Sequence, residues 1–247
     1  MGKVIAIANH KGGVGKTTTT AAVGQALARK GKKVLLIDLD AQANLTSFFV
    51  DEDSIESSVY DALRGTLDKL PIMGVGDNLS LVPASLDLAA AETALASKIA
   101  RERILARLIE NVKGYDYILL DCPPSLGILT TNALAAATDL YIPLTAEALP
   151  LKGLKMLEEI VNEVRRSINP RLNISGVIIT RYNNRKLNKA VLDAIRQQYG
   201  GKVFDTKIRE NIAIAEAPLY NESIFDYAPT SNGAQDYDNL AAEILNR

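Results

Sequence analysis

A stretch rich in glycine, lysine and threonine near the start of the chain has the residue types of a phosphate-binding loop. Residues 8–20 read ANHKGGVGKTTTT, in which Gly12, Gly13 and Gly15 come just before Lys16 and Thr17. Glycines allow backbone N–H groups to approach phosphate oxygens, a lysine at this position reaches the terminal phosphates, and the next hydroxyl binds Mg²⁺. The stretch predicts a site for a nucleoside triphosphate and magnesium.

The same stretch departs from the common phosphate-loop pattern, G-x-x-x-x-G-K-[ST]. His10 stands where the first glycine of that pattern is expected, and an additional lysine, Lys11, follows it. His10 is the sole histidine and has no second histidine or cysteine with which to share a metal ion, so we expect it only to lead into the loop. Lys11 is the feature that the common pattern leaves unexplained.

Three aspartates that follow apolar runs are candidates to complete the site. Asp38 and Asp40, in VLLIDLDAQAN, stand two residues apart, which on a strand directs both side chains toward the same ligand. Asp121 ends the apolar run of YDYILLDCPPS, and Pro123 and Pro124 then take the chain out of the sheet. Asp121 has the setting of a Walker B carboxylate that holds Mg²⁺, and Asp40 is better placed to orient the attacking water. Taken alone, each of these acids could instead cap the segment after it.

Apolar runs alternate with helical segments along the chain. Runs typical of strands buried on both faces lie at Val4–Ala8, Val34–Ile37, Tyr117–Leu120, Leu140–Pro143 and Ile174–Ile179. Helical spacing covers Thr17–Lys30, closed by Gly31, and Leu151–Ile168, which ends before Pro170. The alternation predicts an α/β fold, with a doubly wound, mostly parallel sheet flanked by helices. We expect residues 51–77 to form a helix with loops at the edge of this sheet.

Length and composition are those of one ordinary globular domain over residues 1–247. The chain is 47% hydrophobic, and 28 basic against 29 acidic residues give a net charge of −1, so only a local patch could bind nucleic acid. The single cysteine, Cys122, excludes an intramolecular disulfide and cysteine-rich metal sites. Since we find neither a signal peptide nor an apolar run of ~18 residues, we expect a cytoplasmic protein that does not enter membranes.

Five motifs taken together resemble the ParA/Soj family of chromosome- and plasmid-partitioning ATPases, within the deviant Walker A class of P-loop NTPases that includes MinD. They are KGGVGKTT, DLDAQAN, DCPPS, TAEALPLKGL and ENIAIAEAP, and they run in order over nearly the whole chain. The lysine at position 11 is the most specific of these marks. The resemblance implies the small form of the family, without an N-terminal helix-turn-helix extension, because only nine residues precede His10.

The resemblance implies a role for each residue of the loop and of the acidic stretches. Lys11 would reach the ATP bound by the partner subunit of an ATP-dependent homodimer, as an arginine finger does. Lys11, Lys16 and Asp40 would serve catalysis, Asp40 by positioning water, and Thr17, Asp38 and Asp121 would serve the metal. The nucleotide would be held by Gly12, Gly13, Val14, Gly15, Lys16, Thr17 and Thr18, with the adenine against Thr180, Arg181, Ile208, Arg209 and Asn211. Asn44 and the loop after Asp121 would be switch regions.

A basic region is the candidate surface for DNA. Between Arg181 and Arg209 there are eight basic and two acidic residues, a local net of +6. Such a patch suits sequence-independent contact with the phosphate backbone, and we expect Arg185, Lys186 and Lys189 to carry it. The family's usual I-P-R-N-V-R-L segment reads I-R-E-N-I-A-I here, so its two arginine positions are Glu210 and Ala213. The resemblance also implies a ParB-like or other partner that stimulates hydrolysis, and association with the nucleoid in the ATP state.

Three other functions remain open at this point. A MinD-like positioning ATPase for a membrane or a protein cargo would carry a basic amphipathic helix at its C-terminus, whereas the tail QDYDNLAAEILNR has one arginine against three acids and is expected to pack on the sheet. An iron–sulfur carrier of the same superfamily needs paired cysteines, and Cys122 stands alone. An ATP-dependent metabolic ligase of related fold, such as dethiobiotin synthetase, would ordinarily lack the lysine at position 11.

Overall fold

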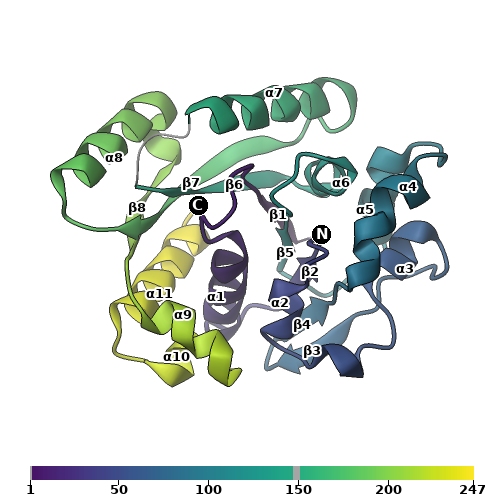
Figure 1. The fold of residues 1–247 in the computed structure, drawn as a ribbon, viewed down its shortest axis with the longest axis horizontal. Helices are drawn as coiled ribbons and strands as arrows, with labels where there is room; N and C mark the ends of the chain where they lie inside the picture. The colour runs from purple at the N-terminus through teal and green to yellow at the C-terminus, as the bar shows by residue number, and fades with distance from the viewer. Residues whose placement is uncertain (1, 147–150) are drawn as a thin grey trace.

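A single mixed sheet forms the centre of the protein, whose computed structural model describes residues 2–146 and 151–247 (Figure 1). The strands are β1 (Lys3–Ile7), β2 (Val34–Asp38), β3 (Met73–Gly76), β4 (Leu79–Val82), β5 (Tyr117–Asp121), β6 (Asp139–Thr145), β7 (Asn173–Tyr182) and β8 (Val203–Arg209). Their order across the sheet is β3-β4-β2-β5-β1-β6-β7-β8. Only the β3–β4 pair is antiparallel among these strand pairs.

Helices cover both faces of the sheet. They are α1 (Lys16–Arg29), α2 (Asn44–Ser47), α3 (Val59–Arg64), α4 (Ala91–Leu95), α5 (Ile104–Glu110), α6 (Ile128–Ala136), α7 (Leu151–Ser167), α8 (Lys186–Tyr199), α9 (Ala213–Glu216), α10 (Ile224–Tyr227) and α11 (Asn232–Leu245). Short 3-10 segments lie at Glu52–Ser54, Leu86–Ala90, Arg101–Arg103, Gly200–Lys202 and Ala217–Tyr220. Figure 1 shows α7 and α8 on one side of the sheet and α1 and α11 on the other.

The residues pointing to the two faces build two separate hydrophobic clusters. In β1, for example, Val4 and Ala6 belong to the cluster under α5–α8, and Ile5 and Ile7 to the cluster under α1 and α11. Residues 4–7 of this strand are all buried, which explains why an uninterrupted apolar run, rather than an alternating one, marks each central strand. The predicted doubly wound α/β fold is confirmed.

The five strands and two helices expected from sequence are present, and three strands were not predicted. β3 and β4 have only four residues each, and β3 holds two glycines. In β8 the buried residues Val203, Phe204 and Ile208 are separated by the more exposed stretch 205–207, so no uninterrupted apolar run marks this edge strand. Residues 51–77 contain the expected helix, α3, but the expectation of loops alone beside it was wrong, because β3 forms a strand at the sheet edge.

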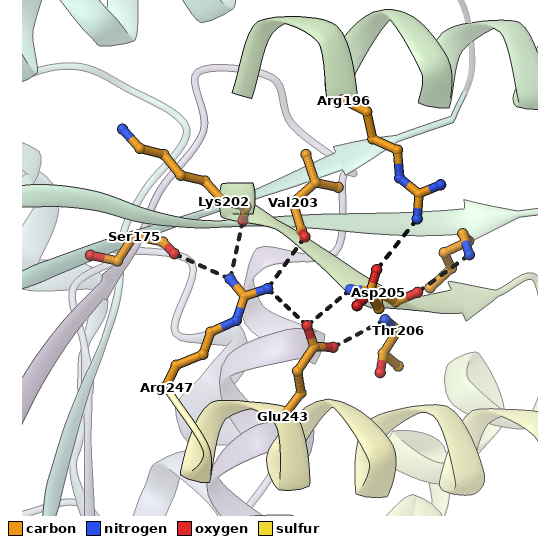
Figure 2. Close-up of polar contacts among 9 residues, drawn as sticks. Ser175, Arg196, Lys202, Val203, Asp205, Thr206, Glu243 and Arg247 are labelled. Carbon is orange, nitrogen blue, oxygen red and sulfur yellow. Dashed lines mark hydrogen bonds and ion pairs between the residues drawn. The ribbon is translucent and has the colours of Figure 1, made fainter. Parts of the chain in front are cut away.

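The C-terminal helix α11 packs on the sheet beside α1 and against β8, as the tail was expected to do. Figure 2 shows the Glu243 carboxylate accepting hydrogen bonds from the backbone N–H groups of Asp205 and Thr206, at 2.9 and 3.1 Å. Arg247 donates to Glu243 at 2.8 Å and stacks over the Phe204 ring at 3.9 Å. These contacts satisfy edge N–H groups that have no neighbouring strand.

Candidate functional site

The predicted phosphate loop connects β1 to α1 at the carboxyl edge of the sheet. Gly13 and Gly15 have φ of +70° and +85°, a left-handed conformation that side-chain-bearing residues rarely adopt. Thr180 of β7 donates its hydroxyl to the Val14 carbonyl oxygen at 2.9 Å, and Asn9 donates to the Pro143 carbonyl oxygen at 2.7 Å. The loop is therefore held to β6 and β7 and leads directly into the positive N-terminal end of α1, a geometry suited to phosphate.

The two lysines of the loop have different surroundings. Lys16 is buried with a relative exposure of 7%, and its Nζ lies 3.4 Å from the Lys11 carbonyl oxygen. Desolvation lowers the pKa of Lys16, against the opposing charge of Asp121. Lys11 is exposed, its backbone N–H is fixed by the Asn9 side chain at 2.9 Å, and it does not line the cavity described below.

Asp121 ends β5 below the loop, and its buried carboxylate has one unused oxygen. Thr20 of α1 donates to Asp121 Oδ1 at 3.1 Å, while Oδ2 is buried without a hydrogen-bond partner among the described residues. Burial, together with the nearby charge of Asp38, raises the pKa of Asp121. An orphaned carboxylate oxygen near the Thr17 hydroxyl and the phosphate loop is a donor set that fits a hard cation such as Mg²⁺.

Asp38 organises the loop that carries Asp40. Its Oδ1 accepts from the Asp40 N–H at 3.0 Å, and its Oδ2 accepts from the Thr46 N–H and hydroxyl at 2.9 and 2.7 Å. Burial is the main reason that the pKa of Asp38 is raised. We expected Asp38 and Asp40 to lie on one strand with both side chains directed to the same ligand, but β2 ends at Asp38 and Asp40 lies in the turn after it. Asp40 lines the cavity and Asp38 is fully buried behind it.

A cavity of about 760 Å³ opens over the loop and collects most of the predicted nucleotide contacts. Its lining includes Gly12, Gly13, Gly15, Lys16, Thr17, Thr18, Asp40, Asn44, Thr180, Arg181, Ile208, Arg209 and Asn211. Val14 is buried and does not line the cavity, but its carbonyl oxygen accepts a hydrogen bond from Thr180, which does. The volume and the mixture of polar loop and apolar wall suit a nucleotide. No cluster of three or more His, Cys, Asp or Glu side chains suited to a metal occurs within residues 2–146 and 151–247.

The end of β8 forms part of the cavity wall. Ile208 is buried, and Arg209 is bound to Asp236 of α11. Tyr237, the next residue of α11, also lines the cavity, and its hydroxyl lies 3.3 Å from that of Thr19. The C-terminal helix thus contacts the cavity wall through Asp236 and α1 through Tyr237.

The predicted basic surface lies around the start of α8. Arg181, Arg185, Lys186 and Lys189 are exposed. Of the eight basic residues counted in this region, Arg196 and Arg209 form ion pairs, with Asp205 at 3.6 Å and Asp236 at 2.7 Å. Glu210 lies near Asn183, at 3.5 Å from its side-chain amide. Within the described part of the chain, no helix is long and apolar enough to cross a membrane.

Four residues that position the site were not singled out from sequence: Asn9, Thr20, Thr46 and Asp236. Thr17 and Thr20 are three residues apart and share a helix face, which is a signal within the TTTT run. Thr46 and Asp236 reach the site only through tertiary contacts, so local spacing gives no signal for them. Residues 147–150 of the motif TAEALPLKGL lie outside the described residues, as do the side chains at 151–153.

Fold and site together define a P-loop NTPase of the deviant class with two lysines in the loop. A family model described as an AAA domain matches residues 2–174. The sporulation initiation inhibitor protein Soj of Bacillus subtilis is 43% identical over 99% of this chain and 98% of its own length. The chromosome-partitioning ATPase Soj of Treponema pallidum is 41% identical over 100% of this chain and 98% of its own length.

Two solved structures cover the full fold. Cobyrinic acid a,c-diamide synthase from Mycobacterium smegmatis, with bound ADP and magnesium, is 34% identical with a TM-score of 0.87, over 99% of this chain and 94% of that one. A plasmid partition protein from Borrelia burgdorferi bound to AMPPNP is 28% identical with a TM-score of 0.86, over 100% and 99%. The chain belongs to the Soj/ParA family of partitioning ATPases. The family assignment made from the sequence motifs, and the expectation of an ATPase, are confirmed.

Proposed function

We propose that this chain is a single-domain partitioning ATPase that dimerises when it binds ATP and Mg²⁺, binds DNA without sequence preference as a dimer, and leaves DNA after a partner stimulates hydrolysis. Structures of one neighbour hold ADP or an ATP analogue together with magnesium, and the buried Oδ2 of Asp121, which has no partner among the described residues, supports magnesium here. The chemistry supplied by the bound ion would be neutralisation of phosphate charge.

We assign the residues of the cavity to the nucleotide as follows. Lys16, Thr18 and the loop N–H groups bind the phosphates, and Thr17 with Asp121 holds the ion. Asp38 has both oxygens engaged in hydrogen bonds, so it acts on the ion's surroundings through Asp121 and through the loop of Asp40. Asp40, which lines the cavity, orients the attacking water. The adenine lies against the wall formed by residues 180–181 and 208–211.

The observation that carries the proposal of a dimer is the position of Lys11. Its backbone is fixed by Asn9, it is exposed, and it is absent from the lining of the cavity in its own subunit. A lysine held in this way supports a contact with the nucleotide of a second subunit, which makes ATP binding and dimerisation one coupled equilibrium.

Sedimentation of the Lys11→Ala variant with ATP and Mg²⁺ tests the proposal. We expect the wild type to form a dimer with ATP, and the variant to stay a monomer while retaining much of its nucleotide affinity. Lys32→Ala, a lysine in the turn after α1, is the matched control and should dimerise normally. An ATP-bound dimer of Lys11→Ala equal to that of the wild type contradicts the role of Lys11 in trans.

The exposed basic residues at the start of α8 support the DNA-binding part of the proposal. Arg185, Lys186 and Lys189 lie together at the beginning of one helix and form no ion pair among the described residues. A dimer presents this surface twice, which raises its avidity for DNA above that of the monomer. The proposed cycle includes a partner of the ParB type that stimulates hydrolysis. The ATP-bound dimer resides at the nucleoid because it binds DNA.

The C-terminal helix argues against a membrane-positioning role. Its apolar residues, among them Tyr237, Leu240 and Ile244, are buried against β8 and α1. A MinD-like membrane anchor needs an apolar face that is free to enter the lipid interface. Cys122 is likewise buried, so it supports no shared cluster at a subunit interface.

A further inference from the structure

The end of β8 departs from the family's sequence at a position that faces the nucleotide cavity. This chain has Arg209 in Ile208-Arg209-Glu210-Asn211, at the place of the proline in the I-P-R-N pattern that the resemblance implies. A proline fixes φ and has no N–H to satisfy, so it holds a strand end rigid at no cost in hydrogen bonds. An arginine removes that restriction and adds both an N–H and a cation that need partners.

Asp236 of α11 supplies both partners. Its Oδ2 accepts from the Arg209 backbone N–H at 2.9 Å, and its two oxygens accept from the guanidinium, from Nη2 at 2.7 Å and from Nε at 3.0 and 3.1 Å. Asp236 has a relative exposure of only 5%, so one buried carboxylate holds the main chain and the side chain of the same residue. A bidentate arginine–carboxylate pair fixes direction as well as distance.

Arg209 lines the cavity, and Asp236 holds it from α11. Ile208, Arg209, Glu210 and Asn211 line the same cavity as the phosphate loop, and Glu210 donates its N–H to the Tyr182 carbonyl oxygen at 3.0 Å, beside β7. The Arg209 N–H points to Asp236 instead of into that ladder. The position therefore tolerates proline, as an edge strand does where its N–H faces away from its neighbour.

We propose that the Arg209–Asp236 pair fixes the wall against which the nucleotide base lies. The inference rests on the proposed function, which places the adenine of ATP against this wall. Asp236 is a positioning residue, because it acts on the nucleotide through Arg209 and the backbone of residues 208–211.

A double substitution separates this role from general stability. Asp236→Val leaves the Arg209 N–H and guanidinium without their partner, and the Kd for ATP should rise by about 5- to 30-fold. Arg209→Pro combined with Asp236→Val removes the N–H and the guanidinium together with their partner, and the proline ring fixes φ, so its Kd should return to within about twofold of the wild type. In turnover, the single variant should show a raised KM and an unchanged kcat.

Two controls make the measurement specific to the base. Inorganic tripolyphosphate, used as a competitor, should bind wild type and Asp236→Val equally, because it contacts the phosphate loop alone. Glu243→Gln, on the same helix, loses the charge that caps Asp205 and Thr206 in Figure 2, and should lower Tm while leaving the Kd for ATP unchanged. Arg209→Lys, which keeps the backbone bond but not the bidentate fork, should weaken ATP binding less than Asp236→Val does.

The ATP affinities of the variants test the role of the Arg209–Asp236 pair, and the ATP affinity of the wild type tests the proposed function. Wild-type ATP affinity in both Asp236→Val and Arg209→Lys overturns the inference, and so does a double variant as weak as the single one. If Asp236→Val does not fold, the double variant and Arg209→Lys still decide the question. Failure of the wild type itself to bind ATP would refute the proposed function instead.

Discussion

The hydroxyl of Thr20 lies 3.1 Å from Asp121 Oδ1 and 3.0 Å from the Lys16 carbonyl oxygen, so its single proton is shared between these two acceptors. This contact joins the first turns of α1 to the end of β5, so the helix that carries the phosphate loop and the strand that carries the candidate metal ligand are held in one geometry. The second oxygen of Asp121 has no hydrogen-bond partner within residues 2–146 and 151–247.

Replacing Thr20 by valine should destabilise the protein, because Asp121 Oδ1 would lose its buried donor. We expect a loss of about 1–3 kcal/mol in the free energy of unfolding, and a fall in Tm of about 2–4 °C for each kcal/mol. Thr131→Val on α6 is the control, since its half-buried hydroxyl only returns to the Gly127 carbonyl oxygen. Equal Tm values for the two variants in thermal denaturation would contradict the importance of the Thr20–Asp121 contact.

The raised pKa of Asp121 predicts a specific dependence of stability on pH. Without metal, the folded state holds a proton on this carboxyl at pH values where the unfolded chain has lost it, so the free energy of unfolding falls as pH rises above about 4. Asp121→Asn carries no charge, and its advantage in Tm over the wild type should grow with pH in metal-free buffer.

Binding of Mg²⁺ with nucleotide should have the opposite pH dependence, because the ion requires the ionised carboxylate. Affinity of the wild type should therefore rise with pH over the same interval, with release of protons that calorimetry in buffers of different ionisation enthalpy detects. Asp121→Asn should lose this dependence together with most of its affinity for Mg²⁺. A pH-independent difference in Tm between the two proteins would count against a raised pKa.

The central strands and the phosphate loop could be predicted from sequence because their signals are local. Runs such as Val34–Ile37 are buried on both faces, and the residues of the loop are contiguous. β8 could not be predicted in the same way, because its pattern reflects its place at the sheet edge under α11. The contacts of Asp38 with Thr46 and of Arg209 with Asp236 span 8 and 27 residues, and only the folded chain brings those groups together.

Asp40 offers a test of the proposed hydrolysis step. Its carboxylate lines the cavity and accepts the Gln42 N–H at 3.1 Å, so Asp40→Ala removes the water-orienting group without opening the buried network of Asp38. We expect ATP binding to persist and turnover to fall by about 10²- to 10⁴-fold, which would accumulate the ATP-bound dimer. Steady-state phosphate release and size-exclusion chromatography with ATP measure the two effects. Asp51→Ala, an exposed aspartate outside the cavity, is the control, and normal turnover in Asp40→Ala would refute the assignment.

The basic surface at the start of α8 is tested by the salt dependence of DNA binding. Each lysine or arginine that contacts a phosphate releases counterions, so the slope of log K against log salt should become shallower by ~1 for each lost contact. Arg185→Ala with Lys189→Ala should weaken binding of duplex DNA of any sequence and flatten the slope by about two units, without changing ATP affinity. Arg165→Ala with Arg166→Ala removes the same charge from the exposed last turn of α7 and should leave the slope unchanged. If the two double variants bind DNA equally in fluorescence anisotropy titrations, the DNA surface lies elsewhere on the protein.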